Sequence, residues 1–375
     1  MARVIGIPSE VKDSERRVGL QPDGAAELVH QGHEVLVQEG AGVGAGFSDS
    51  EYEKAGAKLV STPGEVFEAA GLIVKVKEPV PSEYDLFKEG QELFTYLHLA
   101  ADKGLTEFLM QRKIASIAYE TVELDDGSLP LLTPMSEVAG RMATQAAAHS
   151  LENTSGGAGL LLGGVPGTPA ARVTIIGGGV SGTEAAKIAV GMRAVVRVMD
   201  INPKRLAYLS DIFEGRVDLV TPNRARTAAY VAESDVVIGA VLVAGAKAPK
   251  LVSREMVASM RPGSVVADIA IDQGGCIETS RPTTHSEPTY IEEGVVHYCV
   301  ANIPGAVART STLALTSATL PYLARVAESG IEGAAAADPV LAKGLSTLGG
   351  ELVSEPVAEA HGLEYSRYEA NEVSG

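Results

Sequence analysis

The segment TIIGGGVSGTEAAKIAVGMRAVVRVMD, residues 174–200, places three glycines between an apolar run and a helical pattern. Gly177, Gly179 and Gly182 fit the spacing G-x-G-x-x-G. In a strand–turn–helix unit, the first glycine permits a tight turn and the second lets the backbone approach a pyrophosphate. The third lets the helix pack closely on the strand. Because a strand precedes these glycines and a helix follows them, the segment predicts a dinucleotide-binding turn.

The residues around the turn indicate which dinucleotide it holds. Val180 and Ser181 would present amide groups to the phosphates at the positive end of the helix. Asp200 ends the next apolar run, where an acidic side chain accepts hydrogen bonds from the ribose hydroxyls and repels a 2′-phosphate, which favours NAD over NADP. Lys204 and Arg205 follow closely and weaken this preference, since Arg205 either flanks the ribose or is simply solvated.

Apolar runs and helical patterns alternate on both sides of the turn. Repeated β-α-β order implies parallel sheets that are covered by helices. The patterns predict strands at residues 3–8, 33–40, 71–79, 114–120, 172–177, 195–200, 234–240, 263–270 and 294–300, and helices at 22–32, 136–154 and 311–328.

The fold class is therefore expected to be α/β, with two Rossmann-like domains built on parallel sheets. A substrate domain is expected from residues 1–130 and 306–375, with a NAD-binding domain of residues 131–305 inserted into it. The two longest predicted helices would link the domains, and Ser136 with Glu137 makes a plausible start for the first of them. Ligand is expected in the crevice between the domains, at the carboxyl ends of the strands. The remaining C-terminal residues are expected to be helical or loop.

Composition excludes several classes of function. A formal net charge of −17 over 375 residues repels phosphate backbones, which argues against nucleic acid as a partner. No apolar run reaches the roughly 20 residues of a membrane helix, and the first residues lack a signal-peptide pattern, so we expect a cytoplasmic protein without a membrane partner. Two cysteines, Cys276 and Cys299, are too few for a disulfide framework or a typical zinc site, and they are expected as reduced, partly buried thiols. No metal-ligand cluster is seen, so no metal is expected.

Four polar residues stand out near predicted strand ends, and each has an alternative interpretation. Arg17 follows the first strand but could be a surface residue. Lys77 ends an alternating apolar pattern but could pair with Glu78 or face solvent. His98, in the apolar segment LFTYLHLA, could be a hydrogen-bonded core histidine, and Asp272, before Gln-Gly-Gly, could be a turn residue.

Long motifs around these residues resemble bacterial alanine dehydrogenases, in the family that also contains the transhydrogenase alpha subunit. The resemblance runs from residue 3 to about residue 350 without an obvious gap, and its motifs are VKVKEP, LFTYLHLA, PMSEVAGRMA, IGAVLVAGAKAPKLV, DIAIDQGGCIETSRPTT and YCVANIPGAVARTST. It implies two α/β domains with NAD in the second. The implied reaction is reversible oxidative deamination of L-alanine to pyruvate and ammonia, with NAD as hydride acceptor.

The resemblance also assigns roles to residues. It matches Arg17 and Lys77 to substrate binding, and His98 and Asp272 to catalysis. A homo-oligomer, usually a hexamer, is implied as well. Besides the glycines of the turn, the implied cofactor contacts are Ser136, Val180, Ser181, Asp200, Arg205, Val241, Leu242, Ile269, Arg281, Val300 and Asn302.

The chain departs from the family pattern at Arg193, where a glycine is common, and at Ala308, where a proline is common. A basic residue that is often found in the SGGAG segment is also missing. These departures concern loop conformation and not the implied chemistry.

The residue types suit this reaction. Arginine holds a carboxylate by a planar bidentate contact, and lysine holds a carboxylate or carbonyl oxygen as a compact charge. His98 has an ordinary pKa near ~6.5 and suits proton transfer, while Asp272 would hold the amine or the attacking water. Which of these two residues moves which proton stays open.

Three other functions compete with this interpretation. The NAD-binding part of a transhydrogenase has a similar fold, an opine- or saccharopine-type dehydrogenase would need room for a larger second substrate, and a catalytically silent NAD sensor would need only the turn. Retention of Arg17, Lys77, His98 and Asp272 favours a complete active site.

Overall fold

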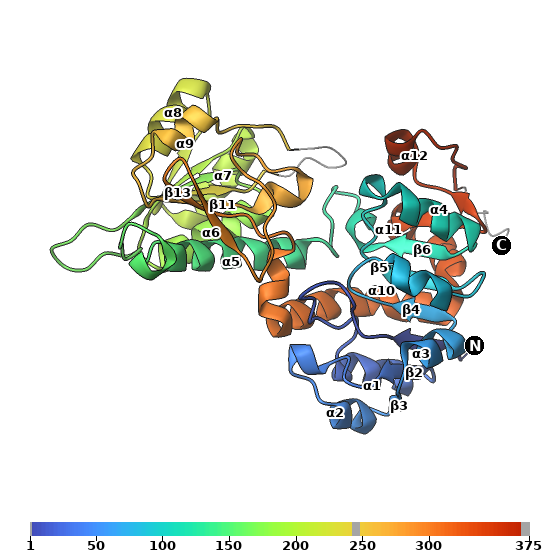
Figure 1. The fold of residues 1–375 in the computed structure, drawn as a ribbon. Helices are drawn as coiled ribbons and strands as arrows, with labels where there is room; N and C mark the ends of the chain where they lie inside the picture. The colour runs from blue at the N-terminus through green and yellow to red at the C-terminus, as the bar shows by residue number, and fades with distance from the viewer. Residues whose placement is uncertain (1, 242–247, 369–375) are drawn as a thin grey trace. The chain divides into compact units, whose positions relative to one another are not determined.

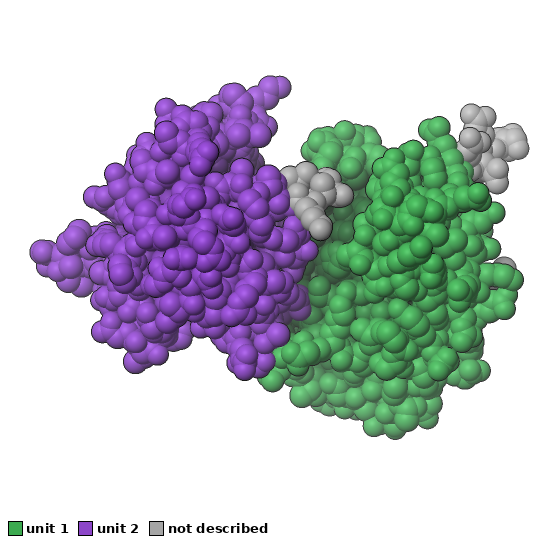
Figure 2. All heavy atoms as spheres, turned by 45° about the horizontal axis from the view of Figure 1, so that its top comes forward, with its two compact units in different colours: residues 1–135, 307–375 green, residues 136–306 purple. Residues whose placement is uncertain are grey.

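The computed structural model describes residues 2–241 and 248–368. The chain folds into two compact units, one made of residues 1–135 and 307–375 and the other of residues 136–306, as the colours of Figure 2 show. The second unit therefore interrupts the first along the sequence. The second unit begins five residues after the predicted limit of 131 and ends one residue after the predicted limit of 305.

The first unit contains a mostly parallel sheet with the strand order β15-β14-β6-β5-β4-β1-β2-β3 among the described residues. The strands β1 to β6 pair in parallel, while β14 and β15 join at one edge in antiparallel orientation. The strands are β1 Val4–Ile7, β2 Glu34–Gln38, β3 Lys58–Val60, β4 Leu72–Val74, β5 Glu92–Thr95, β6 Ala115–Ala118, β14 Leu345–Leu348 and β15 Glu351–Leu352.

The second unit contains another mostly parallel sheet, with the order β12-β13-β11-β10-β7-β8-β9 in its described part. Only its edge strand β12 is antiparallel to its neighbour among the strand pairs described there. The strands are β7 Arg172–Ile176, β8 Val195–Met199, β9 Val217–Val220, β10 Val236–Gly239, β11 Val265–Asp268, β12 Thr289–Glu292 and β13 Val295–Tyr298.

Helices cover the sheets, as the alternation of apolar residues requires (Figure 1). In the second unit, α5, α6 and α7 pack on one face of the sheet, and α8 and α9 pack on the other. The helices are α1 Pro22–His30, α2 Asp49–Lys54, α3 Pro63–Ala69, α4 Lys103–Gln111, α5 Thr133–Ser150, α6 Val180–Gly191, α7 Pro203–Phe213, α8 Arg224–Glu233, α9 Arg254–Ala258, α10 Ala308–Ala337, α11 Pro339–Gly344 and α12 Glu355–His361.

The predicted α/β class with two sheets is confirmed, but several predicted elements are wrong in detail. The predicted strand at 71–79 ends at Val74. The Lys75 N–H still donates to the Phe94 carbonyl of β5, but those of Val76 and Lys77 donate to the Glu10 side chain. The helix predicted to start at Ser136 begins at Thr133, so Ser136 lies within its first turns and does not cap it. The helix predicted at 311–328 is longer than expected. It is α10, Ala308–Ala337, and it is interrupted at Gly330, where φ is 80°.

Six strands were not predicted, namely β3, β5, β9, β12, β14 and β15. Each has at most four residues, but several of the predicted strands are equally short, so length alone does not explain the omission. The C-terminal segment was expected to be helical or loop, yet Thr347 of β14 bonds Ser116 of β6 at 2.7 Å through their hydroxyls. Pairing between residues so distant in the sequence leaves no local signal.

The described helices include none that is long and apolar enough to cross a membrane. Within residues 2–241 and 248–368, no group of three or more His, Cys, Asp or Glu side chains is placed to hold a metal ion. Cys276 and Cys299 are both free and buried.

Candidate active site

The glycine turn lies where the chain order of the second sheet reverses. Strand β7 has β8 on one side and β10 on the other, and ligands of open α/β sheets bind at such a switch point. Gly177 has φ of 102°, and a Cβ there would lie 2.6 Å from the Ala240 carbonyl oxygen. A Cβ on Gly182 would lie 1.9 Å from the Gly177 carbonyl oxygen, whereas Gly179 is exposed and has open space beside it. The first and third glycines are thus required by close packing, and the second leaves the backbone open to a ligand.

Helix α6 begins at Val180, directly after this turn. The first N–H groups of a helix have no partner within it, and they point toward its N-terminal end. Helix α5 crosses here, because a Cβ on Gly140 would lie 2.1 Å from the Ser181 carbonyl oxygen. Ser136 lies four residues before Gly140 on the same helix and therefore on the same face.

Asp200 and Arg205 both hold the glycine turn. The Gly178 N–H donates to Asp200 Oδ2 at 2.7 Å, and the Asn202 N–H donates to Asp200 Oδ1 at 2.7 Å. The Arg205 guanidinium donates to the carbonyls of Gly178 and Gly179 and to the Thr183 hydroxyl. Arg205 is therefore not simply solvated, since the turn itself engages its guanidinium.

Most of the remaining predicted cofactor residues follow parallel strands. Val241, Ile269 and Val300 come one or two residues after β10, β11 and β13, at the same sheet edge as the glycine turn. Asn302 follows with a left-handed φ of 65°. Arg281 lies in an exposed loop with its guanidinium 3.9 Å from the centre of the Tyr290 ring. Leu242 lies outside the described residues.

Arg17, in the first unit, is buried, which contradicts the surface interpretation. Its side chain is 2% exposed and forms a two-point ion pair with Glu15, with contacts of 2.7 Å and 2.5 Å. Burial opposes the charge of Arg17, but the adjacent Glu15 outweighs it and raises the pKa of the guanidinium. Its Nη1 atom lies 3.1 Å from the Met135 sulfur.

Lys77 comes three residues after β4, in a segment that a buried carboxylate holds. The N–H groups of Val76 and Lys77 donate to Glu10 at 2.7 Å and 3.3 Å. The Lys77 side chain neighbours Glu78. Although burial raises the pKa of Glu78, the charges of Lys77 and Lys12 outweigh this effect and lower it.

His98 is not the core histidine that one interpretation of its apolar segment predicted. Its side chain is 44% exposed, and its backbone is left-handed, with φ of 50°. Glu120 follows β6 and accepts the His98 N–H at 2.6 Å, while a Glu120 oxygen lies 3.8 Å from His98 Nδ1. A left-handed residue other than glycine costs about 1–3 kcal/mol and persists where its surroundings hold it, often at functional sites.

Arg17, Lys77 and His98 thus follow β1, β4 and β5, which are adjacent in the first sheet, so all three residues come after strands that end at its carboxyl edge. Asp272 belongs to the second unit. It is exposed, within the single turn Ile269–Gln273 that follows β11. Asp268 is fully buried below it and accepts the N–H groups of Ala270 and Ile277, each at 3.1 Å, so it ties together both ends of the segment that carries Asp272.

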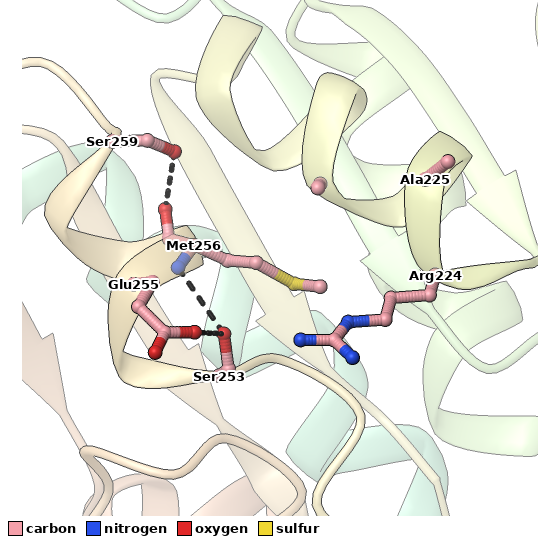
Figure 3. Close-up of a pocket in the computed structure, with 7 residues that line it drawn as sticks. Arg224, Ala225, Ser253, Glu255, Met256 and Ser259 are labelled. Carbon is pink, nitrogen blue, oxygen red and sulfur yellow. Dashed lines mark hydrogen bonds between the residues drawn. The ribbon is translucent and has the colours of Figure 1, made fainter.

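A surface pocket of 510 Å³ between α8 and α9 contains none of these residues (Figure 3). The Arg224 side chain extends toward Ser253 and Met256 across it, and Ser253 caps α9. This pocket does not contribute to the candidate site.

Family models match almost all of the chain. The model described as "Alanine dehydrogenase/PNT, N-terminal domain" matches residues 6–139, and the corresponding C-terminal domain matches residues 143–355. The chain belongs to the alanine dehydrogenase/PNT family.

Individual relatives agree with this assignment. The chain is 56% identical to an alanine dehydrogenase of Methanococcus maripaludis over 97% of this chain and 98% of that protein. A solved L-alanine dehydrogenase superposes with a TM-score of 0.92 and 52% identity, covering 95% of this chain and 98% of that one. A transhydrogenase from Sinorhizobium meliloti superposes with a TM-score of 0.81 and 25% identity, covering 93% and 100%.

The structure explains two departures of this chain from the alanine dehydrogenase pattern. Arg193 has a left-handed φ of 65°, the conformation that glycine adopts without steric cost. Ala308 is the first residue of α10, a position where the fixed φ of proline suits a helix. Both substitutions keep the backbone that the common residue favours.

The acidic residues that hold the candidate site were missed from the sequence. Glu10, Glu120 and Asp268 lie at or within three residues of the end of a parallel strand, whereas Glu15 lies farther along the loop after β1. An acidic residue at the end of a buried strand is the signal that could have identified the first three. The partners of all four, however, are backbone N–H groups and an arginine whose positions depend on the fold.

Proposed function

We propose that this member of the alanine dehydrogenase/PNT family converts L-alanine, NAD⁺ and water reversibly into pyruvate, ammonium, NADH and a proton. The observation that carries the proposal is that Arg17, Lys77 and His98 lie at one edge of the first sheet, in a chain that is 56% identical to an alanine dehydrogenase. Two cationic side chains can bind the carboxylate of a small amino acid, and an imidazole can accept a proton from its ammonium group.

Arg17 and Lys77 are assigned to the substrate carboxylate. Glu15 engages one side of the guanidinium, while its Nη1 end faces the Met135 sulfur at 3.1 Å. A guanidinium has five N–H donors and binds a carboxylate by a planar two-point contact, which suits Arg17 to this role. The Lys77 ammonium adds a second positive charge to the same group.

His98 and Asp272 are assigned to proton transfer. The alanine ammonium must lose a proton before its nitrogen lone pair can form the C=N bond. Water then adds to the imine carbon, a proton reaches the nitrogen, and the C–N bond breaks to release ammonia and form the carbonyl of pyruvate. An exposed imidazole suits the acceptance and return of these protons, and the Asp272 carboxylate would stabilise the positively charged iminium.

The second unit is assigned to NAD. The open face at Gly179, the close approach at Gly182 and the start of α6 fit a pyrophosphate, and Asp200 fits the ribose hydroxyls. Because the turn engages the Arg205 guanidinium, this residue is poorly placed to hold a 2′-phosphate, which supports NAD over NADP. When bound, the nicotinamide supplies the acceptor for the hydride from the alanine Cα.

A transhydrogenase-like role without turnover of alanine is the second candidate, because the transhydrogenase superposes with a TM-score of 0.81. NADH oxidation measured with pyruvate, with and without ammonium, separates the two. Oxidation that depends on ammonium supports alanine dehydrogenase. Oxidation without ammonium indicates a 2-hydroxy acid dehydrogenase, and NADH binding without oxidation favours the transhydrogenase-like or sensor role.

We also propose a homo-oligomer, and a hexamer by family resemblance. Light scattering coupled to size-exclusion chromatography would test this, since a hexamer has six times the chain mass of 38.8 kDa. A mass equal to one chain would contradict it.

A further inference from the structure

The segment that carries Lys77 is held by a side chain in addition to the neighbouring strand. The Lys75 N–H donates to the Phe94 carbonyl of β5 and the Val76 carbonyl accepts the Tyr96 N–H, whereas the N–H groups of Val76 and Lys77 donate to Glu10 at 2.7 Å and 3.3 Å. On the other side, the Thr95 hydroxyl donates to the Lys77 carbonyl at 3.2 Å. The backbone of Lys77 is therefore held at both of its polar groups.

Glu10 lies in a buried cluster with one positive and two negative members. Lys75 is fully buried, with Nζ 2.7 Å from Glu83 and 3.4 Å from Glu10. Burial opposes the charge of Lys75, but Glu10 and Glu83 together outweigh it and raise the pKa of the ammonium. Glu83 is the closer partner, but Glu10 makes the larger electrostatic contribution, so the two carboxylates together stabilise the buried ammonium.

A second buried carboxylate is costly, because a buried charge loses its hydration. The Glu10 side chain is 1% exposed, and Glu15 lies close enough to oppose its charge further. Glu10 follows β1, whereas Val76 and Lys77 follow β4, so its contacts tie together the ends of two neighbouring strands. Glu83 accepts the N–H of Val80 at 3.0 Å, whereas Glu10 accepts those of Val76 and Lys77.

We propose that Glu10 is a positioning residue for substrate binding, which holds the backbone of Val76 and Lys77 so that the Lys77 ammonium reaches the substrate carboxylate. The inference rests on the proposed function, in which Lys77 binds that carboxylate. It adds a residue that touches no substrate itself and acts through Lys77.

Glu10→Gln tests the inference, with Glu83→Gln as a matched control. Each change removes one negative charge beside Lys75 and alters a carboxylate that accepts backbone N–H groups, but only the first places an amide NH₂ against the N–H groups of Val76 and Lys77. We expect Glu10→Gln to raise the KM for pyruvate by about tenfold or more, because small displacements of a binding group weaken its contribution strongly. Glu83→Gln should change this KM by less than about twofold, and both variants should bind NADH as the unchanged protein does, within about twofold.

A double-mutant cycle with Lys77→Ala separates positioning from a general structural role. If Glu10 acts through Lys77, then Glu10→Gln should have little further effect on the pyruvate KM in the Lys77→Ala background. Where Glu10→Gln does not fold, Lys75→Met combined with Glu10→Gln and Glu83→Gln removes all three buried charges and carries the same cycle.

Equal effects of Glu10→Gln and Glu83→Gln, or full additivity with Lys77→Ala, would overturn the inference. An unchanged pyruvate KM in Lys77→Ala would instead remove Lys77 from the proposed function. In that case Glu10 has no substrate-binding lysine to position, and the inference is wrong as well.

Discussion

The glycine turn of the second unit depends mainly on backbone groups. The polar edge of the first unit, where Arg17, Lys77 and His98 lie, depends mainly on side chains. The turn is made of backbone, since its glycines allow close approach and its amides face the predicted ligand. The polar edge is made of residues that carboxylates hold, such as the buried Glu15 at the Arg17 guanidinium and the partly buried Glu120 at the His98 N–H. A backbone site depends on a local pattern, whereas a side-chain site depends on partners distant in the sequence.

The largest expected effect is a loss of turnover without a loss of cofactor binding, because the two depend on different residues. His98→Ala and Asp272→Ala should each lower kcat by about 10²–10⁴-fold, because each removes a group assigned to proton transfer. Affinity for NADH should stay within about twofold, since the glycine turn is unchanged. Steady-state kinetics and NADH fluorescence titration measure the two quantities.

His149→Ala is the control for these variants. The His149 side chain is 70% exposed, so its removal should change neither kcat nor NADH affinity. Near-normal turnover in His98→Ala or Asp272→Ala would remove that residue from the mechanism. Loss of NADH binding in His98→Ala would contradict the assignment of cofactor binding to the second unit alone.

Gly182→Ala should have the next largest effect, and it acts on the cofactor. The added Cβ would lie 1.9 Å from the Gly177 carbonyl oxygen, so the turn must shift. Overpacking of this kind costs about 1–3 kcal/mol, and if this cost falls on the bound state it lowers NADH affinity by about fivefold to 150-fold.

Gly191→Ala lies in the same helix and has no atom within 4 Å of its added Cβ, so it should leave NADH affinity unchanged. Comparison of the two dissociation constants isolates close packing from helix propensity. Equal affinities would show that the turn tolerates the side chain.

Asp200→Ala should alter cofactor choice by a smaller factor. Loss of the carboxylate removes repulsion of a 2′-phosphate, so the ratio of kcat/KM for NAD to that for NADP should fall by about tenfold. Because Asp200 also accepts the Gly178 N–H, weaker binding of both cofactors is expected, and the ratio is the informative quantity.

Asp211→Ala provides the control, because it removes an exposed acidic side chain from α7. It should leave the NAD-to-NADP ratio unchanged. An unchanged ratio in Asp200→Ala would contradict the role of Asp200.

The smallest expected effect concerns left-handed residues in the two units. His98 and Arg193 both have positive φ, but only His98 is assigned a function. Arg193→Gly should raise the free energy of unfolding by about 0.5–1 kcal/mol, since glycine adopts this conformation freely. Denaturant unfolding measures the change, and kcat should not move. A loss of stability would show that the Arg193 side chain contributes more than the left-handed backbone costs.

These two kinds of site also explain what the sequence could reveal. Gly177, Gly179 and Gly182 predict a turn because strand, spacing and helix are contiguous, and the structure has that geometry. The α/β class follows in the same way from repeated strands and helices. The packing of Arg17 and the exposure of His98 could not be derived, because Glu15 and Glu120 matter only once the strands are adjacent. The short edge strands β14 and β15 were missed for the same reason.

The antiparallel pairing of β14 with β6 affects the order in which the two units can fold during translation. All of residues 136–306 are synthesised between β6 and β14, so the second unit has its whole sequence before the first unit does. Until Leu345–Leu348 emerge, β6 has an unpaired edge, the kind of edge that invites pairing with another chain. Domains generally fold as units during translation, so a nascent chain that ends near residue 306 carries one foldable unit and one waiting for its last strands.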